Sequence, residues 1–126
     1  MVGLVVVSHS ATAAEGIAEV AGEMGGDTRI EPVGGDGEGG FGTVPDDIED
    51  ALGAADDGDG VVVLVDLGSA VMNAEVALEL SDADAVIADA PVLEGAVNAA
   101  VAATSPKATV DSVREQAEAA SDIDKL

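Results

Sequence analysis

Four short strand-like runs alternate along the chain with longer segments in which apolar residues recur every three or four positions. The runs cover residues 2–8, 28–33, 61–65 and 85–88. Their length and their content of Val, Ile and Leu predict four β-strands. The third run, Val-Val-Val-Leu-Val, has no polar residue, which is typical of a central parallel strand covered on both faces. Pro32 limits ladder hydrogen bonding in the second run, so we expect that strand at an edge.

The segments between these runs predict amphipathic helices, because their apolar residues share one face. The expected buried faces are Ile17, Val20, Ala21 and Met24; Val44, Ile48, Ala51, Leu52 and Ala55; Met72, Val76, Ala77 and Leu80; Leu93, Val97, Ala100 and Val101; and, more weakly, Val110, Val113, Ala117 and Ala120. Ser10 or Thr12 is expected to cap the first helix and Thr43 the second, since Ser and Thr accept hydrogen bonds from free N–H groups in a first turn. Residues 34–42 contain six glycines and predict a long loop.

The alternation of strand and helix predicts one α/β domain over residues 1–126, with a final helix added. We expect an open, mainly parallel four-stranded sheet in the order 2-1-3-4, with helices on both faces. In that order the first and third strands lie side by side where the strand order reverses. Ligands of open α/β sheets bind at this reversal, beyond the carboxyl ends of the strands.

The net charge of the chain indicates which classes of partner this domain can bind. The chain has 26 acidic residues and 4 basic ones, a formal net charge of −22. Nucleic acids and anionic membranes are therefore poor partners, because both are bound through Lys and Arg. Regular apolar segments argue against a disordered acidic chain. We interpret the charge as an adaptation to a halophilic, salt-rich cytosol, where the Debye length falls to about 3 Å and surface repulsion is screened.

The composition also bears on the compartment. Apolar residues make up 48% of the chain and aromatic residues 1%, and no apolar stretch is long enough to span a bilayer. There is no cysteine, and the N-terminus lacks the pattern of a signal peptide. We therefore expect a cytoplasmic protein without disulfides or a Cys-ligated metal.

The candidate chemistry lies at the ends of the two central strands. His9, the only histidine, follows the first strand, and Asp66 follows the third. A carboxylate that binds one imidazole nitrogen fixes the tautomer and leaves the other nitrogen as a nucleophile. Judged alone, a histidine at a strand end is as often structural as functional, and an aspartate there is more often a turn former. Their predicted convergence on one edge of the sheet favours a catalytic pair.

An anion has several prospective ligands at the same edge. They are Ser10, Thr43, Gly68 and Ser69, which supply hydroxyls, close backbone approach and helix N-termini with free N–H groups. The glycine-rich loop lacks the terminal Lys-Ser/Thr of a nucleotide P-loop. The acids in and after it, Asp36, Glu38, Asp46 and Asp47, match no EF-hand spacing, and we expect no metal site on this chain.

Four segments carry a resemblance to a known family. They are Val7-Ser8-His9-Ser10, Gly42-Thr43, Asp66-Leu67-Gly68-Ser69-Ala70 and Ala90-Pro91-Val92-Leu93-Glu94-Gly95-Ala96. Together, and in this order over the whole chain, they resemble the IIA domains of the mannose class of the phosphoenolpyruvate:sugar phosphotransferase system (PTS). The stretch from Pro91 to Ala96 is most similar to the phosphotransferase subunits of dihydroxyacetone kinases.

The resemblance implies a phosphocarrier. His9 would accept phosphate from the phosphocarrier HPr and pass it to ADP on the L subunit of the kinase, which phosphorylates dihydroxyacetone bound to the K subunit. Asp66 would orient His9, and Ser69 and Thr43 would lie near the phosphoryl group. The family also implies a homodimer, no cofactor on this subunit, and Mg²⁺ with the nucleotide on the kinase. Some relatives carry HPr-like and enzyme-I-like domains, which we expect here on separate proteins.

Two alternatives remain at this point. A mannose-class sugar-transport IIA domain would use the same chemistry but pass the phosphate to a IIB domain. The other alternative is a non-enzymatic flavodoxin-like binding or receiver module. A receiver would need an acidic cluster after the first strand, where this chain has Ser8-His9-Ser10. The dimer interface is open, and the fourth helix and the last helix are the candidates.

Overall fold

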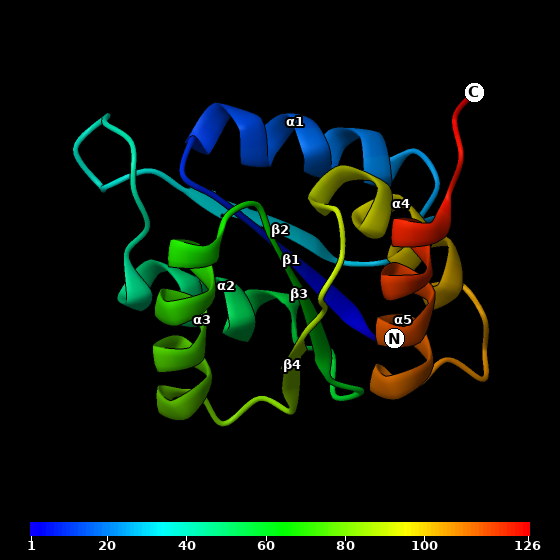
Figure 1. Cartoon of the computed structure of the whole chain (residues 1–126). Coiled ribbons are helices and arrows are strands. Elements are labelled where there is room, and N and C mark those ends of the chain that lie inside the picture. The colour runs from blue at the N-terminus through cyan, green and yellow to red at the C-terminus, as the bar shows by residue number, and fades with distance from the viewer.

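Five helices cover a four-stranded sheet in the computed structural model, which describes residues 1–126 (Figure 1). The elements are β1 (Gly3–Ser8), α1 (Ala11–Gly22), β2 (Ile30–Gly34), α2 (Pro45–Ala55), β3 (Val61–Val65), α3 (Gly68–Leu80), β4 (Ala85–Ile87), α4 (Val92–Ala103), α5 (Val110–Glu118) and a terminal 3₁₀ turn (Ala119–Asp122). The predicted order of elements is confirmed. The second strand begins two residues later than predicted, at Ile30. None of the helices combines the length and the apolar character needed to cross a lipid bilayer.

The sheet has the order β2-β1-β3-β4, and all its strand pairs are parallel. This confirms the predicted fold class and the edge position of β2. At the carboxyl end of β1, Val7 pairs with Val33 of β2 and with Val65 of β3. The residues that follow β1 and β3 therefore emerge next to each other, at the reversal of strand order.

Two apolar layers hold the helices against the sheet. Helices α1, α4 and α5 pack on one face, and α2 and α3 pack on the other, as Figure 1 shows. Successive residues of β1 feed the two layers in turn: Leu4 and Val6 enter the first, Val5 and Val7 the second. All six residues of β1 are buried, so the strand that leads to His9 is fixed on both sides.

The predicted face of α3 is wrong except at Ala77. Met72, Val76 and Leu80 are 70%, 44% and 56% exposed, whereas Ala70, Ala74 and Ala77 are buried against the sheet. Small alanines let the helix approach the sheet closely, and the larger apolar side chains point outwards. The periodicity of the larger apolar residues therefore identified an apolar stripe on α3, but that stripe faces outwards and not towards the sheet.

The predictions for α1 and α4 are wrong in part, for the same reason. Val20 and Met24 lie exposed on or after α1, and Leu93 and Val101 are exposed on α4. The buried positions of these helices are occupied mainly by alanines and glycine: Ala14, Ala21, Gly95, Ala96, Ala99, Ala100 and Ala103. The face predicted for α2 is confirmed at Ile48, Ala51, Leu52 and Ala55.

Candidate active site

The backbone of His9 is held from two directions where β1 ends. Its N–H donates to Oδ2 of Asp66 at 3.0 Å, and its carbonyl accepts from the N–H of Gly42 at 2.9 Å. Gly34 lies alongside, where a Cβ atom would come within 2.3 Å of the Ser8 carbonyl oxygen. Only glycine therefore fits where β2 passes the end of β1. The imidazole is carried on a rigid segment and remains about one quarter exposed.

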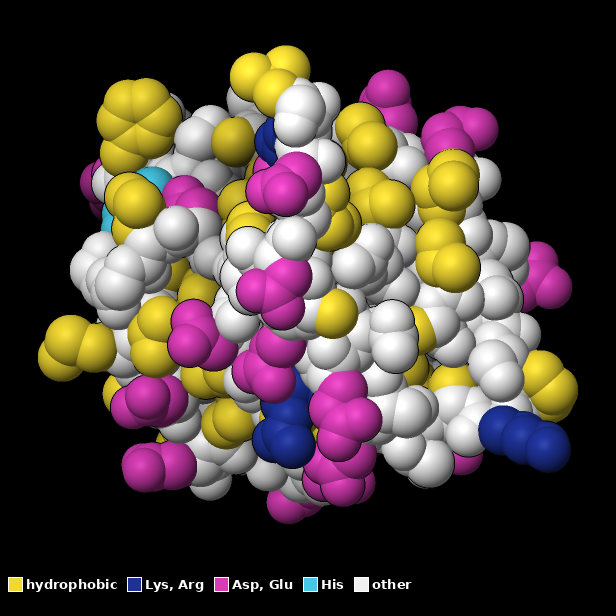
Figure 2. All heavy atoms as spheres, turned by 45° about the vertical axis from the view of Figure 1, so that its right-hand side comes forward, with side chains coloured by type: hydrophobic (Ala, Val, Ile, Leu, Met, Phe, Trp, Pro, Cys, Tyr) yellow, Lys and Arg dark blue, Asp and Glu magenta, His cyan; other side chains and the backbone are white.

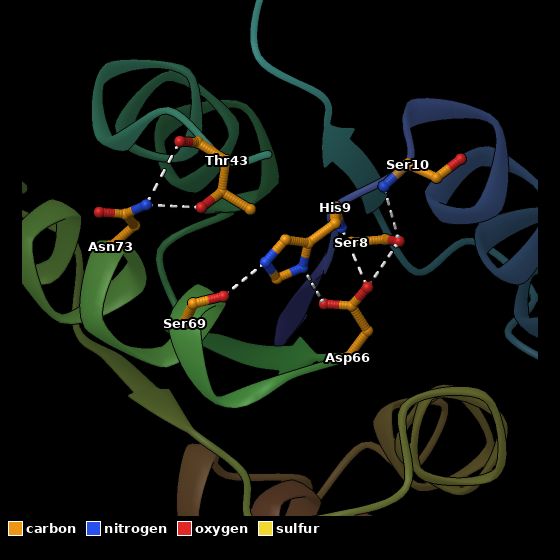
Figure 3. Close-up of polar contacts among 7 residues, drawn as sticks. All are labelled: Ser8, His9, Ser10, Thr43, Asp66, Ser69 and Asn73. Carbon is orange, nitrogen blue, oxygen red and sulfur yellow. Dashed lines mark hydrogen bonds and ion pairs between the residues drawn. The ribbon is translucent and has the colours of Figure 1, made fainter. Parts of the chain in front are cut away.

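Asp66 binds three donors with its two oxygens (Figure 3). Oδ1 lies 2.9 Å from Nδ1 of His9, and Oδ2 accepts from the His9 N–H and from the Ser8 hydroxyl at 2.9 Å. Partial burial by itself raises the pKa of the Asp66 carboxyl. The hydrogen bonds from the His9 N–H, the imidazole and Ser8 outweigh burial and hold that pKa below its usual value. Asp66 is thus a carboxylate at neutral pH.

This contact sets the chemistry of the imidazole. A carboxylate only accepts hydrogen bonds, so the nitrogen facing it, Nδ1, carries the proton in the neutral ring. The lone pair is then on Nε2, which lies 2.5 Å from Oγ of Ser69. The donor in that contact is the Ser69 hydroxyl, because Nε2 has no hydrogen in this tautomer. Nε2 therefore carries the free lone pair of the imidazole, and it points away from Asp66 (Figure 3).

The N-terminus of α3 opens beside Nε2. Ser69 is the second residue of α3, and the helix has no side-chain cap at Leu67. The N–H groups of Gly68 and Ser69 have no hydrogen-bond partner within the chain, whereas the Ala70 N–H binds the Leu67 carbonyl. Free N–H groups and the helix dipole favour a negative charge at this position.

Thr43 and Asn73 lie together on the same side of the imidazole as Ser69 (Figure 3). The prediction that Thr43 caps α2 is wrong: the cap position is Val44, and no side chain caps it. Instead, Nδ2 of Asn73 donates to the Thr43 hydroxyl oxygen at 2.6 Å and to the Thr43 carbonyl at 3.3 Å. Asn73 is not among the residues predicted from the sequence. Its spacing of four residues from Ser69, which places both on one helix face, was the available signal.

Ser10, the remaining predicted phosphate ligand, lies elsewhere. Its hydroxyl accepts from the Ala13 N–H at 3.2 Å and caps α1, and its own N–H donates to the Ser8 hydroxyl at 3.1 Å. Figure 3 shows Ser10 on the far side of His9 from Ser69 and Thr43. The structure thus brings Thr43, Gly68 and Ser69 around one side of the imidazole and uses the Ser10 side chain to begin a helix.

Two hollows are lined by site residues and their chain neighbours, and His9 itself lines neither of them. One, of about 460 Å³, runs from Asp66, Leu67 and Gly68 to the residues after β4. The other, of about 440 Å³, lies between the start of α1 and the glycine-rich loop. Within that loop, the backbone N–H groups of Glu38 and Gly40 bind the Asp36 carboxylate and lower its pKa. The loop is therefore locally ordered, and its Gly42 end is attached to His9.

No Lys or Arg takes part in the site. Arg29, Arg114 and Lys125 pair with Asp57, Asp111 and Glu94, and Lys107 lies in the turn before α5. Figure 2 shows acidic side chains over much of the visible face, with hydrophobic side chains next to the histidine. Phe41 and Leu67, the neighbours of Gly42 and Asp66 in the chain, are both largely exposed. The imidazole is thus hydrogen-bonded to Asp66 and to the neutral Ser69 hydroxyl, and hydrophobic side chains lie next to it on the surface (Figure 2).

The chain is similar to a known family over most of its length. Residues 3–114 match the EIIA-man family model, described as the PTS system fructose IIA component. The phosphoryl donor subunit DhaM of PEP-dependent dihydroxyacetone kinase 2 from Listeria innocua is 42% identical, over 80% of this chain and 85% of that protein. The phosphotransferase subunit DhaM of PTS-dependent dihydroxyacetone kinase from Lactococcus lactis is 33% identical, over 92% and 93% of the two chains.

The fold has a solved counterpart. The crystal structure of a protein of unknown function superimposes with a TM-score of 0.80, at 31% identity and over 94% of each chain. The family match, the curated relatives and the parallel 2-1-3-4 sheet lead to one assignment. The chain belongs to the EIIA-man family of PTS components and, within it, to the DhaM-type phosphotransferase subunits.

Proposed function

We propose that this chain is a phosphocarrier that takes a phosphoryl group from phospho-HPr onto Nε2 of His9. It then hands the group to ADP on the L subunit of a dihydroxyacetone kinase, which phosphorylates dihydroxyacetone on the K subunit. The observation that carries this proposal is the 2.9 Å contact between Nδ1 of His9 and Asp66. That contact leaves Nε2 as the free nitrogen. The names of the relatives support the choice of kinase.

The first transfer forms one bond and breaks one. The lone pair on Nε2 attacks the phosphorus of phospho-HPr in line with the phosphorus–nitrogen bond of the donor. As the new bond forms, the old one breaks, and its electron pair returns to the imidazole of HPr. The His9 ring becomes positively charged, and the Asp66 carboxylate, hydrogen-bonded to Nδ1, stabilises that charge.

The second transfer reverses the first. A terminal phosphate oxygen of ADP attacks the phosphorus, the phosphorus–Nε2 bond breaks, and its electron pair returns to Nε2. In between, the hydroxyls of Ser69 and Thr43 and the free N–H groups of α3 are the prospective ligands of the phosphoryl oxygens. Neither step requires a metal ion or cofactor on this chain, and Mg²⁺ arrives with the nucleotide on the kinase subunit.

The surroundings of Nε2 suit a protein partner. Phe41 and Leu67 are 82% and 60% exposed, and each lies one residue from a residue that contacts His9. An apolar border of this kind can be buried against a partner surface, which removes water from the reacting groups. Because apolar contact is not weakened by salt, it would allow docking in a cytosol of high ionic strength. We expect the chain to act as a homodimer in such a cytosol.

The phosphohistidine is tested by incubation with phosphoenolpyruvate, enzyme I and HPr. The protein should gain an acid-labile, base-stable phosphate, and His9→Ala should not. Label retained by the His9→Ala variant would refute the assignment of the nucleophile.

The partner is tested by a chase of the phosphorylated protein. The label should pass to an ADP-loaded kinase L subunit and, with the K subunit present, to dihydroxyacetone. Transfer to a sugar-specific IIB domain alone would exclude the kinase and support the sugar-transport alternative.

A further inference from the structure

Asn73 makes two hydrogen bonds to one residue of the site. It lies one turn after Ser69 on α3, and its Nδ2 is 2.6 Å from the Thr43 hydroxyl oxygen and 3.3 Å from the Thr43 carbonyl oxygen. The second contact fixes the orientation of the amide. A backbone carbonyl only accepts hydrogen bonds, so the group that faces Thr43 must be the NH₂ and not the amide oxygen.

This orientation determines what the Thr43 hydroxyl can do. A hydroxyl has one hydrogen to donate and two lone pairs to accept with. The Asn73 NH₂ occupies a lone pair and cannot accept, so the Thr43 hydrogen must be directed elsewhere. Figure 3 shows Thr43 and Ser69 on the same side of the imidazole, the side to which Nε2 points. A phosphoryl group on Nε2 would occupy the space between them.

The two hydroxyls are prepared in different ways. Ser69 already donates to Nε2 and becomes free to bind a phosphoryl oxygen only when Nε2 is phosphorylated. Thr43 is held as a donor beforehand by Asn73, without contact to the imidazole. Because the site contains no Lys or Arg, such oriented neutral donors are its means of binding the three phosphoryl oxygens.

We propose that Asn73 is a positioning residue that directs the Thr43 hydroxyl hydrogen towards the phosphoryl group on His9. This inference rests on the proposed phosphorylation of Nε2 but not on the identity of the donor or acceptor. The competing explanation is that Asn73 only ties the start of α2 to α3. That role would change stability without a specific effect on the phosphohistidine.

The experiment measures the phosphohistidine itself. Wild type, Asn73→Ala, Thr43→Val, Thr43→Ser and the Asn73→Ala/Thr43→Val double variant are phosphorylated by phospho-HPr and, separately, by phosphoramidate. Phosphoramidate is a small donor that needs no docking surface. For each variant one follows the rate of phosphorylation, the hydrolytic lifetime and the ³¹P chemical shift, with thermal unfolding as the check on folding.

The expected pattern is non-additive. Thr43→Val removes a hydrogen bond to a charged oxygen, and Asn73→Ala leaves that bond without its oriented donor. Each single variant should therefore phosphorylate roughly tenfold more slowly than wild type, with a shifted ³¹P resonance. The double variant should match Thr43→Val within about twofold, because Asn73 has no hydroxyl left to orient. Thr43→Ser should retain most of the wild-type rate.

Other results would overturn the inference. Additive losses in the double variant, or a lower unfolding midpoint with an unchanged phosphorylation rate and ³¹P shift, would leave Asn73 a structural residue. Phosphorylation by phosphoramidate but not by phospho-HPr would reject the proposed donor while still testing Asn73. Absence of phosphohistidine with both donors would reject both proposals.

Discussion

Replacing Asp66 by Asn should slow phosphoryl transfer to His9 more than replacing it by Ala. In the wild type, Oδ2 of Asp66 accepts from the His9 backbone N–H, which can only donate. In Asp66→Asn the amide oxygen must keep that position, so the NH₂ turns towards Nδ1 of His9. Nδ1 then has to accept, and the imidazole is held in the tautomer with its hydrogen on Nε2. The nucleophilic lone pair is lost, although every distance is preserved.

The expected loss of phosphorylation rate differs between Asp66→Asn and Asp66→Ala. The same tautomer reversal in a Ser-His-Asp triad costs about 10⁴-fold in turnover. Asp66→Ala removes a charge-assisted hydrogen bond of about 1.5–3 kcal/mol, but water can bind Nδ1, so a loss of about 10- to 100-fold is expected. We therefore expect Asp66→Asn to accept phosphate about 100-fold more slowly than Asp66→Ala.

The assay is the rate of phosphoryl transfer from phospho-HPr, with His9→Ala as the blank. Imidazole ¹⁵N NMR of the unphosphorylated protein reports the tautomer directly, and it should show hydrogen on Nδ1 in the wild type and on Nε2 in Asp66→Asn. An Asp66→Asn variant that is faster than Asp66→Ala, or that keeps the wild-type tautomer, would refute the reasoning.

The remaining predictions concern the frame around the imidazole. Gly34→Ala should lower the free energy of unfolding by about 1–3 kcal/mol and slow phosphorylation, because its Cβ would lie 2.3 Å from the Ser8 carbonyl oxygen. Gly53→Ala is the control: it lies on α2 with open space around it, so it should be neutral or stabilising by up to about 1 kcal/mol. Ser10→Ala should cost about 1 kcal/mol in chemical denaturation through the lost cap and leave the phosphorylation rate unchanged; a large loss of rate would place Ser10 in the phosphate site. The lowered pKa of Asp66 contributes stability that is present above the pKa of an unfolded carboxyl, about 3.9, and is lost as pH falls through the lower folded value. Unfolding midpoints of wild type and Asp66→Asn should thus converge below pH 4, and a constant difference down to pH 2 would contradict this.

The sheet order and the meeting of His9 with Asp66 could be predicted from sequence because each follows from strong local patterns. Two strongly apolar strands each ended in a polar residue, and strand order in a parallel sheet brings such ends together. Only the side-chain period and a topological rule were needed. The same reasoning placed Ser69 near the imidazole, since it opens the helix after the third strand.

The orientation of α3 and the role of Thr43 could not be predicted, because both depend on contacts between elements. A hydrophobicity scale predicts that Met72 is buried rather than the smaller Ala74. In the structure Ala74 packs against the sheet and Met72 is exposed. Thr43 is a residue type favoured at helix caps, but Pro45 is the first residue of α2 and places the cap at Val44. The Thr43 hydroxyl instead accepts a hydrogen bond from Asn73, thirty residues later. The sequence around either residue gives no sign that the two are in contact.

The absence of Lys and Arg from the site has an energetic consequence. A phosphate held by fixed cations lies in a deep well, and the energy gained on binding must be supplied again when it leaves. Around His9 the prospective ligands of a phosphoryl group are hydroxyls and peptide N–H groups, which would orient the group without neutralising it. The phosphorus–nitrogen bond would therefore keep most of its group-transfer potential while attached. Such a site would suit a phosphocarrier, which binds the phosphoryl group only briefly and can transfer it in either direction at nearly equal free energy.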